Sequence, residues 1–141
     1  MLQGNKIEDI PIGTTAKFSK TVGESDVYLF AGITGDLDPN HVDEEYCKQT
    51  PFGSRIAHGA LVVGYMSTTS TLVTQGFERP IVSLGYDRIR FVKPVFIGDT
   101  INVTYKIVQI DVEKQRTIAD IQVTNQNGET VAVATHIQKV L

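Results

Sequence analysis

Ala57-His58-Gly59-Ala60-Leu61-Val62-Val63-Gly64-Tyr65-Met66 opens a segment that continues to Gly76 without an Asp, Glu, Lys or Arg. Its large apolar side chains cover much of the circumference of a helix, which is the pattern of a buried helix. Gly64, Ser67 and Ser70 lie between them and lower the helix propensity, so tertiary packing must hold the helix in place. We therefore predict one long central helix that ends near Gly76.

The remaining apolar pattern is that of strands. Alternation predicts one strand before the helix, at residues 14–22, and four after it, at residues 81–92, 101–112, 117–124 and 131–140. Leu84 and Tyr86 have the opposite parity to Ile89 and Phe91, which predicts a bulge near Asp87. The four later strands can pair in order as an antiparallel meander.

One sheet and one apolar helix have a simple packing solution. A sheet that curls around the helix buries the helix and the inner face of the sheet together. We therefore predict an α+β fold, with an antiparallel sheet wrapped around a long central helix, in a single domain over residues 1–141. The edge strands would stay exposed, and pairing with a second copy would cover them. We expect a homodimer or a dimer of dimers.

Composition narrows the class of partner. The chain has 141 residues, 41% of them hydrophobic, and a net charge of −3 with interspersed signs, so it has no basic stripe for nucleic acid or for a membrane surface. Its longest apolar run, residues 60–66, is far below the roughly 20 residues that cross a bilayer. The single Cys47 cannot form an intrachain disulfide, and residues 1–20 hold no apolar signal segment. We expect a cytoplasmic protein that binds a small molecule.

The segment between the first strand and the central helix is expected to contain short helices. Thr21 and Glu24 have the spacing of a capping box and predict a helix that runs to Gly35. Acidic residues at positions 43–45 suit the first turn of another short helix through Gln49.

Gly35-Asp36-Leu37-Asp38-Pro39-Asn40-His41 carries the first chemical signal. A Gly and a Pro bracket a carboxylate and an imidazole five positions apart, so a rigid turn can face both side chains onto one small volume. Gly59 opens the central helix, and backbone N–H groups at a helix start hold negative charge well. An acid–base pair and an oxyanion site would then lie close together.

Other readings of the polar residues are weaker. Asp36, Asp38, His41 and Asp43 could suggest a calcium loop, but the glycine required at its sixth place is absent, so no metal site and no cofactor are expected. Cys47 has no partner Cys and is expected to serve packing. Structural roles are also expected for His58 and His136.

Several segments resemble the MaoC-like family of (R)-specific enoyl-CoA hydratases. They are Phe30-Ala31-Gly32-Ile33-Thr34-Gly35-Asp36, Pro39 and His41, His58-Gly59, and the stretch at residues 90–99. The resemblance implies the hot-dog fold, dimerisation, and reversible addition of water to a trans-2-enoyl-CoA thioester. It also implies that Asp36 and His41 activate the water, that the Gly59 N–H receives the thioester oxygen, and that Ser67 supports the site.

The substrate side of the site leaves alternatives open. Arg90 and Lys93 can reach the phosphates of a CoA carrier, although a solvated strand face explains them equally well. The family commonly has Asn at the position of Asp38 and an apolar residue at that of Asn40. Asp38 either caps the turn or disturbs the chemistry through like-charge repulsion. An acyl-CoA thioesterase and a non-catalytic acyl-CoA-binding protein are the competing functions.

Overall fold

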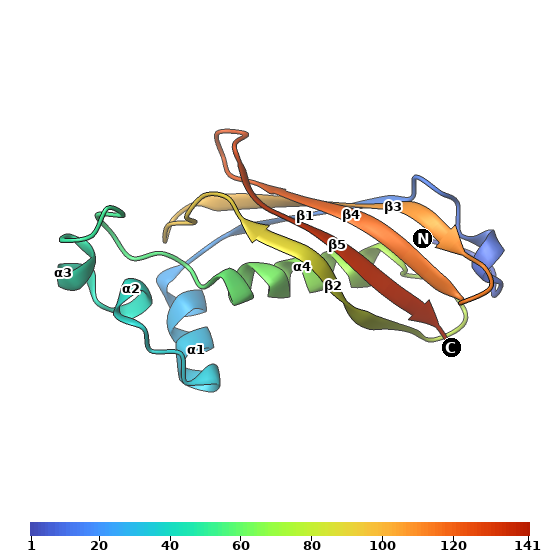
Figure 1. Cartoon of the computed structure of the whole chain (residues 1–141), viewed down its shortest axis with the longest axis horizontal. Helices are drawn as coiled ribbons and strands as arrows, with labels where there is room; N and C mark the ends of the chain where they lie inside the picture. The colour runs from blue at the N-terminus through green and yellow to red at the C-terminus, as the bar shows by residue number, and fades with distance from the viewer.

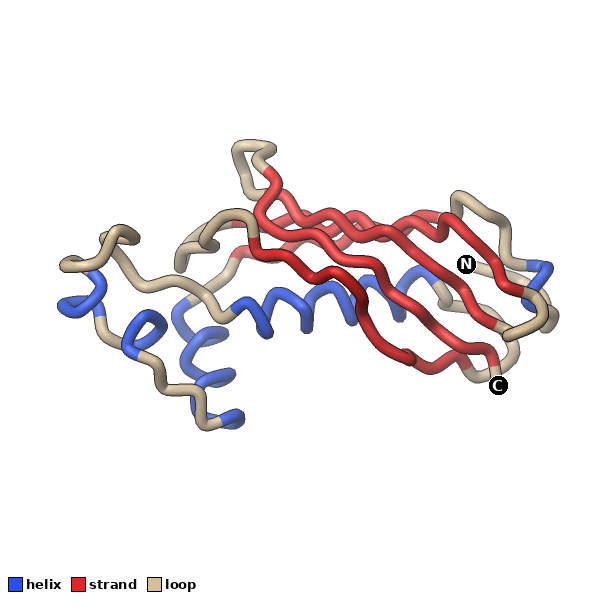
Figure 2. The backbone as a smooth tube through the Cα atoms, viewed as in Figure 1, coloured by secondary structure: helices blue, strands red, loops and turns tan.

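The computed structural model describes residues 1–141 and contains a five-stranded antiparallel sheet laid along one long helix (Figure 1). After a 3-10 turn at Ile7–Asp9, the strands are β1 (Thr15–Thr21), β2 (Ile81–Phe91), β3 (Thr100–Asp111), β4 (Arg116–Thr124) and β5 (Thr130–Val140). The helices are α1 (Glu24–Thr34), α2 (Pro39–Val42), α3 (Glu44–Cys47) and α4 (Gly59–Val73). Figure 2 shows α4 running along the sheet and the three shorter helices grouped at one end. The predicted α+β fold, with a sheet on a central helix, is confirmed.

The strand order is β1-β3-β4-β5-β2, and all neighbouring strands are antiparallel. The predicted meander is therefore correct for β3, β4 and β5 but wrong for β2, which pairs with β5. The edge of β3 that β2 would have used is occupied by β1. The chain leaving β2 is instead held beside β5, because the N–H groups of Val92 and Lys93 both donate to the Val131 carbonyl oxygen.

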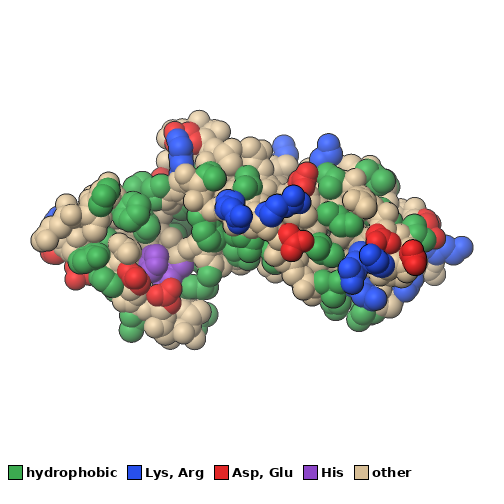
Figure 3. Space-filling view, viewed as in Figure 1, with side chains coloured by type: hydrophobic (Ala, Val, Ile, Leu, Met, Phe, Trp, Pro, Cys, Tyr) green, Lys and Arg blue, Asp and Glu red, His purple; other side chains and the backbone are tan.

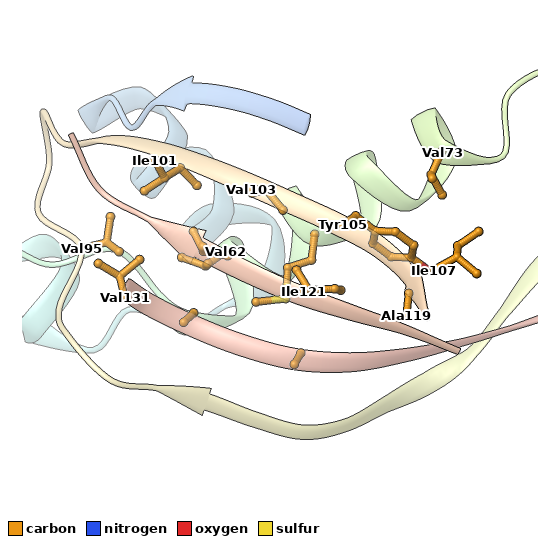
Figure 4. Close-up of a cluster of buried hydrophobic side chains, with 14 of the residues drawn as sticks. Val62, Val73, Val95, Ile101, Val103, Tyr105, Ile107, Ala119, Ile121 and Val131 are labelled. Atoms are coloured by element: carbon orange, nitrogen blue, oxygen red, sulfur yellow. The ribbon is translucent and has the colours of Figure 1, made fainter. Parts of the chain in front are cut away.

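The core lies between α4 and the sheet. Ile101, Val103, Tyr105 and Ile107 alternate along β3 and are fully buried. Figure 4 shows side chains of the strands gathered on one side of the sheet together with Val62 and Val73 of α4. Burial of each such Val or Ile side chain stabilises the fold by about 1.5–3 kcal/mol, so this face fixes α4 along the sheet.

Only one side of α4 is buried, which corrects the expectation of a helix buried all round. The buried side holds Val62, Met66, Thr69, Ser70 and Val73. The exposed side holds Ala60, Gly64, Ser67, Thr68, Thr71 and Leu72. A single sheet covers one side of a helix, and most of the side chains on the other side are small and expose little apolar area. None of the helices combines the length and the apolar character needed to cross a membrane.

The predicted bulge in β2 is confirmed. The pairing of β2 with β5 shifts by one residue between Asp87 and Arg90, and Arg88 adopts a left-handed backbone with φ of 51°. A second shift between Ser83 and Gly85 was not predicted. The two extra residues change which side chains of this edge strand face α4.

The start of α1 differs from the predicted capping box. Gly23, not Thr21, is the N-cap residue, and its N–H donates to the Asp26 carboxylate (2.8 Å). The hydroxyl of Thr21 instead pairs with that of Thr100 on β3 (2.7 Å). Thr21 is the last residue of β1, and because its hydroxyl is hydrogen-bonded within the sheet it does not cap α1.

Candidate active site

The loop that carries Asp36 is shaped by helix ends. Gly35 ends α1 in the left-handed conformation that glycine adopts without strain (φ 83°), and its N–H donates to the Ala31 carbonyl oxygen. Asp38 then caps α2, because its carboxylate accepts the Asn40 N–H (2.8 Å). The short helix α2 stands where the sequence pattern predicted only a turn, although Asp followed by Pro is a helix-start signal. The end of α1 therefore positions Asp36, and the short helix α2 positions His41.

His41 is held in one tautomer. Its Nδ1 lies 2.7 Å from the Ile56 carbonyl oxygen. A carbonyl oxygen only accepts, so Nδ1 carries the proton and donates, and the neutral ring keeps its lone pair on Nε2. Nε2 is then the atom that can take a proton from a substrate.

His58 links the two halves of the site. Its Nε2 donates to the backbone carbonyl oxygen of Asp36 (3.0 Å), and its ring stacks on that of His41 with centroids 3.7 Å apart. The side chain is 2% exposed, and Nδ1 has no hydrogen-bond partner. The structural role expected for His58 is therefore to tie the Asp36 loop to the start of α4.

Asp36, His41 and His58 converge. Each offers one polar atom, and these atoms lie within 4.8 Å of one another, a spacing that could also hold a metal ion. The group includes neither Asp38 nor Asp43, which the calcium-loop reading required. Two of the four imidazole nitrogens already face carbonyl oxygens. The remaining arrangement suits proton transfer between a carboxylate and an imidazole.

Gly59 starts α4 at the edge of a pocket of about 390 Å³. No side chain caps this helix, and the Leu61 N–H donates to the His58 carbonyl oxygen, so the N–H groups of Gly59 and Ala60 remain free to bind a negatively charged oxygen. The largely apolar pocket walls include His41, Phe52, Ile56, Gly59, Phe91 and Val131. Figure 3 shows the histidine side chains in a recess of the surface, beside acidic and hydrophobic residues. His41 and the start of α4 therefore line one largely apolar pocket.

Of the other expected site residues, Lys93 lines the pocket, whereas Ser67 and Arg90 do not. Ser67 is two turns along α4 on its exposed side, next to the Tyr86 phenol, and it does not line the pocket. Lys93 lines the pocket but pairs with Glu129 (2.6 Å). Arg90 is exposed, does not line the pocket, and donates to the Ile89 carbonyl oxygen.

An ion cluster around Arg55, which the sequence pattern did not predict, lies beside the site. Arg55 contacts Glu44 through Nε (2.6 Å) and Glu24 through Nη1 (2.8 Å), and Nη1 also donates to the Tyr28 hydroxyl (2.7 Å). These partners, Glu44 foremost, raise the pKa of Arg55. The cluster ties α1 and α3 to the segment that presents the Ile56 carbonyl oxygen to His41. Residues so far apart in sequence gave no local signal.

Comparisons with known proteins identify the family of this chain. A family model described as MaoC like domain matches residues 8–132. An (R)-specific enoyl-CoA hydratase from Rhodospirillum rubrum is 40% identical over 108 residues, which cover 77% of this chain and 73% of the relative.

Two solved structures share the fold over nearly the whole chain. The R-hydratase PhaJ1 from Pseudomonas aeruginosa has a TM-score of 0.83 at 29% identity, covering 96% of this chain and 84% of the other. A monoamine oxidase regulatory protein from Archaeoglobus fulgidus has a TM-score of 0.87 at 32% identity, covering 98% and 95%. The hot-dog architecture implied by the sequence is confirmed, and the chain belongs to the MaoC-like dehydratase family.

Proposed function

We propose that this protein is an (R)-specific enoyl-CoA hydratase that reversibly adds water to trans-2-enoyl-CoA and gives (R)-3-hydroxyacyl-CoA. The observation that carries the proposal is the fixed tautomer of His41, whose Nδ1 bond to Ile56 frees Nε2 in the pocket that Gly59 also lines. Relatives named as (R)-specific enoyl-CoA hydratases support the choice of substrate and stereochemistry. We place its activity in the cytoplasm, on soluble thioesters.

The reaction needs two proton movements. The oxygen of water bonds to the β-carbon and loses a proton, while the α-carbon gains one. Asp36 and His41 lie close enough to share these roles, and His41 Nε2 has the lone pair to act as the base in the hydration direction. Positioned acid–base groups of this kind contribute about 10²- to 10⁴-fold in rate.

Charge also develops on the thioester oxygen as water attacks. The Gly59 N–H, at the uncapped start of α4, is the proposed donor to that oxygen. A fixed donor of this type is worth about 2.7–4 kcal/mol of transition-state stabilisation. The largely apolar pocket walls lower the local dielectric around this donor and so strengthen the interaction.

The test follows the absorbance of the conjugated double bond of crotonyl-CoA and of a longer enoyl-CoA. Wild type should consume the enoyl group, and Asp36→Asn and His41→Ala should each lose about 10²- to 10⁴-fold in kcat/KM while remaining folded. Asp120→Asn, an exposed carboxylate on β4, is the matched control and should keep full activity. Unchanged activity in either site variant would sink the proposed pair. Release of free CoA thiol without loss of the enoyl absorbance would identify a thioesterase.

The protein is further proposed to act as a homodimer, alone or within a dimer of dimers. The outer strands of the sheet, β1 and β2, each leave one edge unpaired in the single chain. Exposed strand edges are templates for pairing with another chain.

A further inference from the structure

We infer that Phe91 is a positioning residue of this site, delivered to the start of α4 by the bulge in β2, and that it fixes the approach of the thioester to the Gly59 N–H. The inference rests on the proposed hydratase function. Position 59 must then be a glycine because the Phe91 ring, rather than the substrate, leaves no room for a side chain.

The contact is close. A Cβ atom built on Gly59 would lie 2.6, 2.6 and 2.9 Å from three atoms of the Phe91 ring, which are its nearest neighbours. Gly59 has ordinary helical backbone, so its conformation does not require glycine. The ring occupies the volume that a side chain at position 59 would need.

The bulge brings the ring to this place. Between Asp87 and Arg90 β2 advances by one residue more than β5, which places Phe91 opposite Ala132. Ala132 is buried and faces α4, as do alternate residues along β5. Without the extra residue, Phe91 would point to the other face of the sheet. Arg88 in this bulge adopts a left-handed backbone with φ of 51°, and such local strain is common beside functional sites.

The ring is also open to the pocket. Phe91 is 54% exposed and lines the pocket together with His41 and Gly59. One part of the ring therefore packs on Gly59 while another faces the space that the substrate would fill. A flat wall beside the Gly59 N–H excludes water from that donor and limits where the thioester oxygen can lie.

The test is a double-mutant cycle on kcat/KM with crotonyl-CoA, using Gly59→Ala, Phe91→Ala and the combination. Gly59→Ala alone should cost at least about 10²-fold, because the new methyl group collides with the ring and displaces the N–H donor. Phe91→Ala alone should cost about 10-fold, mainly in kcat, whereas Phe91→Tyr, which keeps the ring, should retain activity. In the Phe91→Ala background, Gly59→Ala should cost less than about threefold further.

Phe52→Ala is the matched control, since Phe52 lines the same pocket but is not among the atoms nearest to Gly59. In that background Gly59→Ala should cost its full amount. Equal losses from Gly59→Ala in the wild-type and Phe91→Ala backgrounds would overturn the inference, because the methyl group would then collide with substrate. Unchanged kcat and KM in Phe91→Ala would overturn it as well.

Thermal melting of the same variants separates this inference from the proposed function. The melting temperature should fall in Gly59→Ala and fall no further when Gly59→Ala is added to Phe91→Ala. An inactive wild type with this melting pattern would refute the hydratase function and the positioning role while confirming the packing contact. An active wild type with additive losses in kcat/KM would refute the positioning role alone.

Discussion

Asp38 lies between Asp36 and His41 and is, with Asn40, one of the two residues at which the loop departs from the family pattern. Its carboxylate accepts the Asn40 N–H at the start of α2 (2.8 Å), and its own N–H lies 3.4 Å from an Asp36 carboxylate oxygen. Asn caps helices about as well as Asp. The capping bond favours the reading in which Asp38 is a structural exchange for Asn.

Asp38→Asn is therefore expected to keep kcat/KM for an enoyl-CoA within about threefold of wild type, since the helix cap survives. Asp38→Ala should lower the free energy of unfolding by about 1 kcal/mol through loss of the cap, measured by urea denaturation. A rise in kcat/KM of tenfold or more in Asp38→Asn would show instead that the extra carboxylate repels charge formed in the reaction.

For single residues, the sequence pattern selects candidate side chains but not the backbone groups that hold those side chains in place. Residue type and spacing select Asp36, His41 and Gly59 as candidates, and the structure places Asp36 beside His41 and puts His41 and Gly59 on one pocket. Residue type and spacing do not select the Ile56 carbonyl that orients His41 or the Asp36 carbonyl that binds His58. Every residue has a carbonyl, so only the three-dimensional arrangement distinguishes these two.

At the scale of helices and strands, the sequence pattern predicted the positions of the strands and the bulge near Asp87, but not the order of the strands in the sheet. Alternation in β3 and the parity change in β2 are local patterns that each strand displays by itself. Pairing of β2 with β5 joins segments separated by β3 and β4, and no local pattern encodes such a partner. The one-sided burial of α4 escaped prediction for the same reason.

A polar cluster links three strands inside the core. His136 on β5 is fully buried, with Nε2 2.7 Å from the Ser83 hydroxyl on β2 and Nδ1 2.8 Å from the Tyr105 hydroxyl on β3. The Tyr86 ring stacks on the imidazole at 4.1 Å. Hydroxyls can donate or accept, so a neutral imidazole is satisfied at both nitrogens. The cluster confirms the structural role expected for His136.

Stability should therefore fall in mild acid. Burial lowers the pKa of His136 to about 4, against about 6.5 in the unfolded chain. Because the unfolded state binds the proton more readily, the contribution of His136 is complete above about pH 6.5 and is lost as the pH falls toward about 4. The loss should reach about 3 kcal/mol, measured by urea denaturation across this range.

His136→Gln is the control for this pH dependence, because the amide keeps polar atoms in the cluster and does not titrate. The variant should be less stable near pH 7 yet show a flatter profile between about pH 6.5 and 4. The same slope in the variant and the wild type would assign the acid sensitivity to other groups.

At the scale of the whole molecule, the two edges of the sheet differ in character. The β1 edge presents Lys17 and short polar side chains, and an exposed lysine discourages pairing. On β2, Val82 and Leu84 are 39% and 48% exposed. Exposed apolar side chains on an unpaired strand favour contact with another chain. The asymmetry points to β2 as the edge through which two copies would join.

Sedimentation velocity should accordingly find wild type at twice the chain mass of 15.5 kDa, or at four times that mass if two dimers associate. Leu84→Asp should shift it toward the monomer, because pairing β2 with its copy would bury an unpaired carboxylate. The control Ser19→Asp adds the same charge at an exposed position of β1 and should leave the dimer intact. Melting temperatures at low protein concentration establish that both variants fold. A dimer that survives Leu84→Asp but dissociates with Ser19→Asp would move the interface to β1, and a monomeric wild type would refute pairing through either edge.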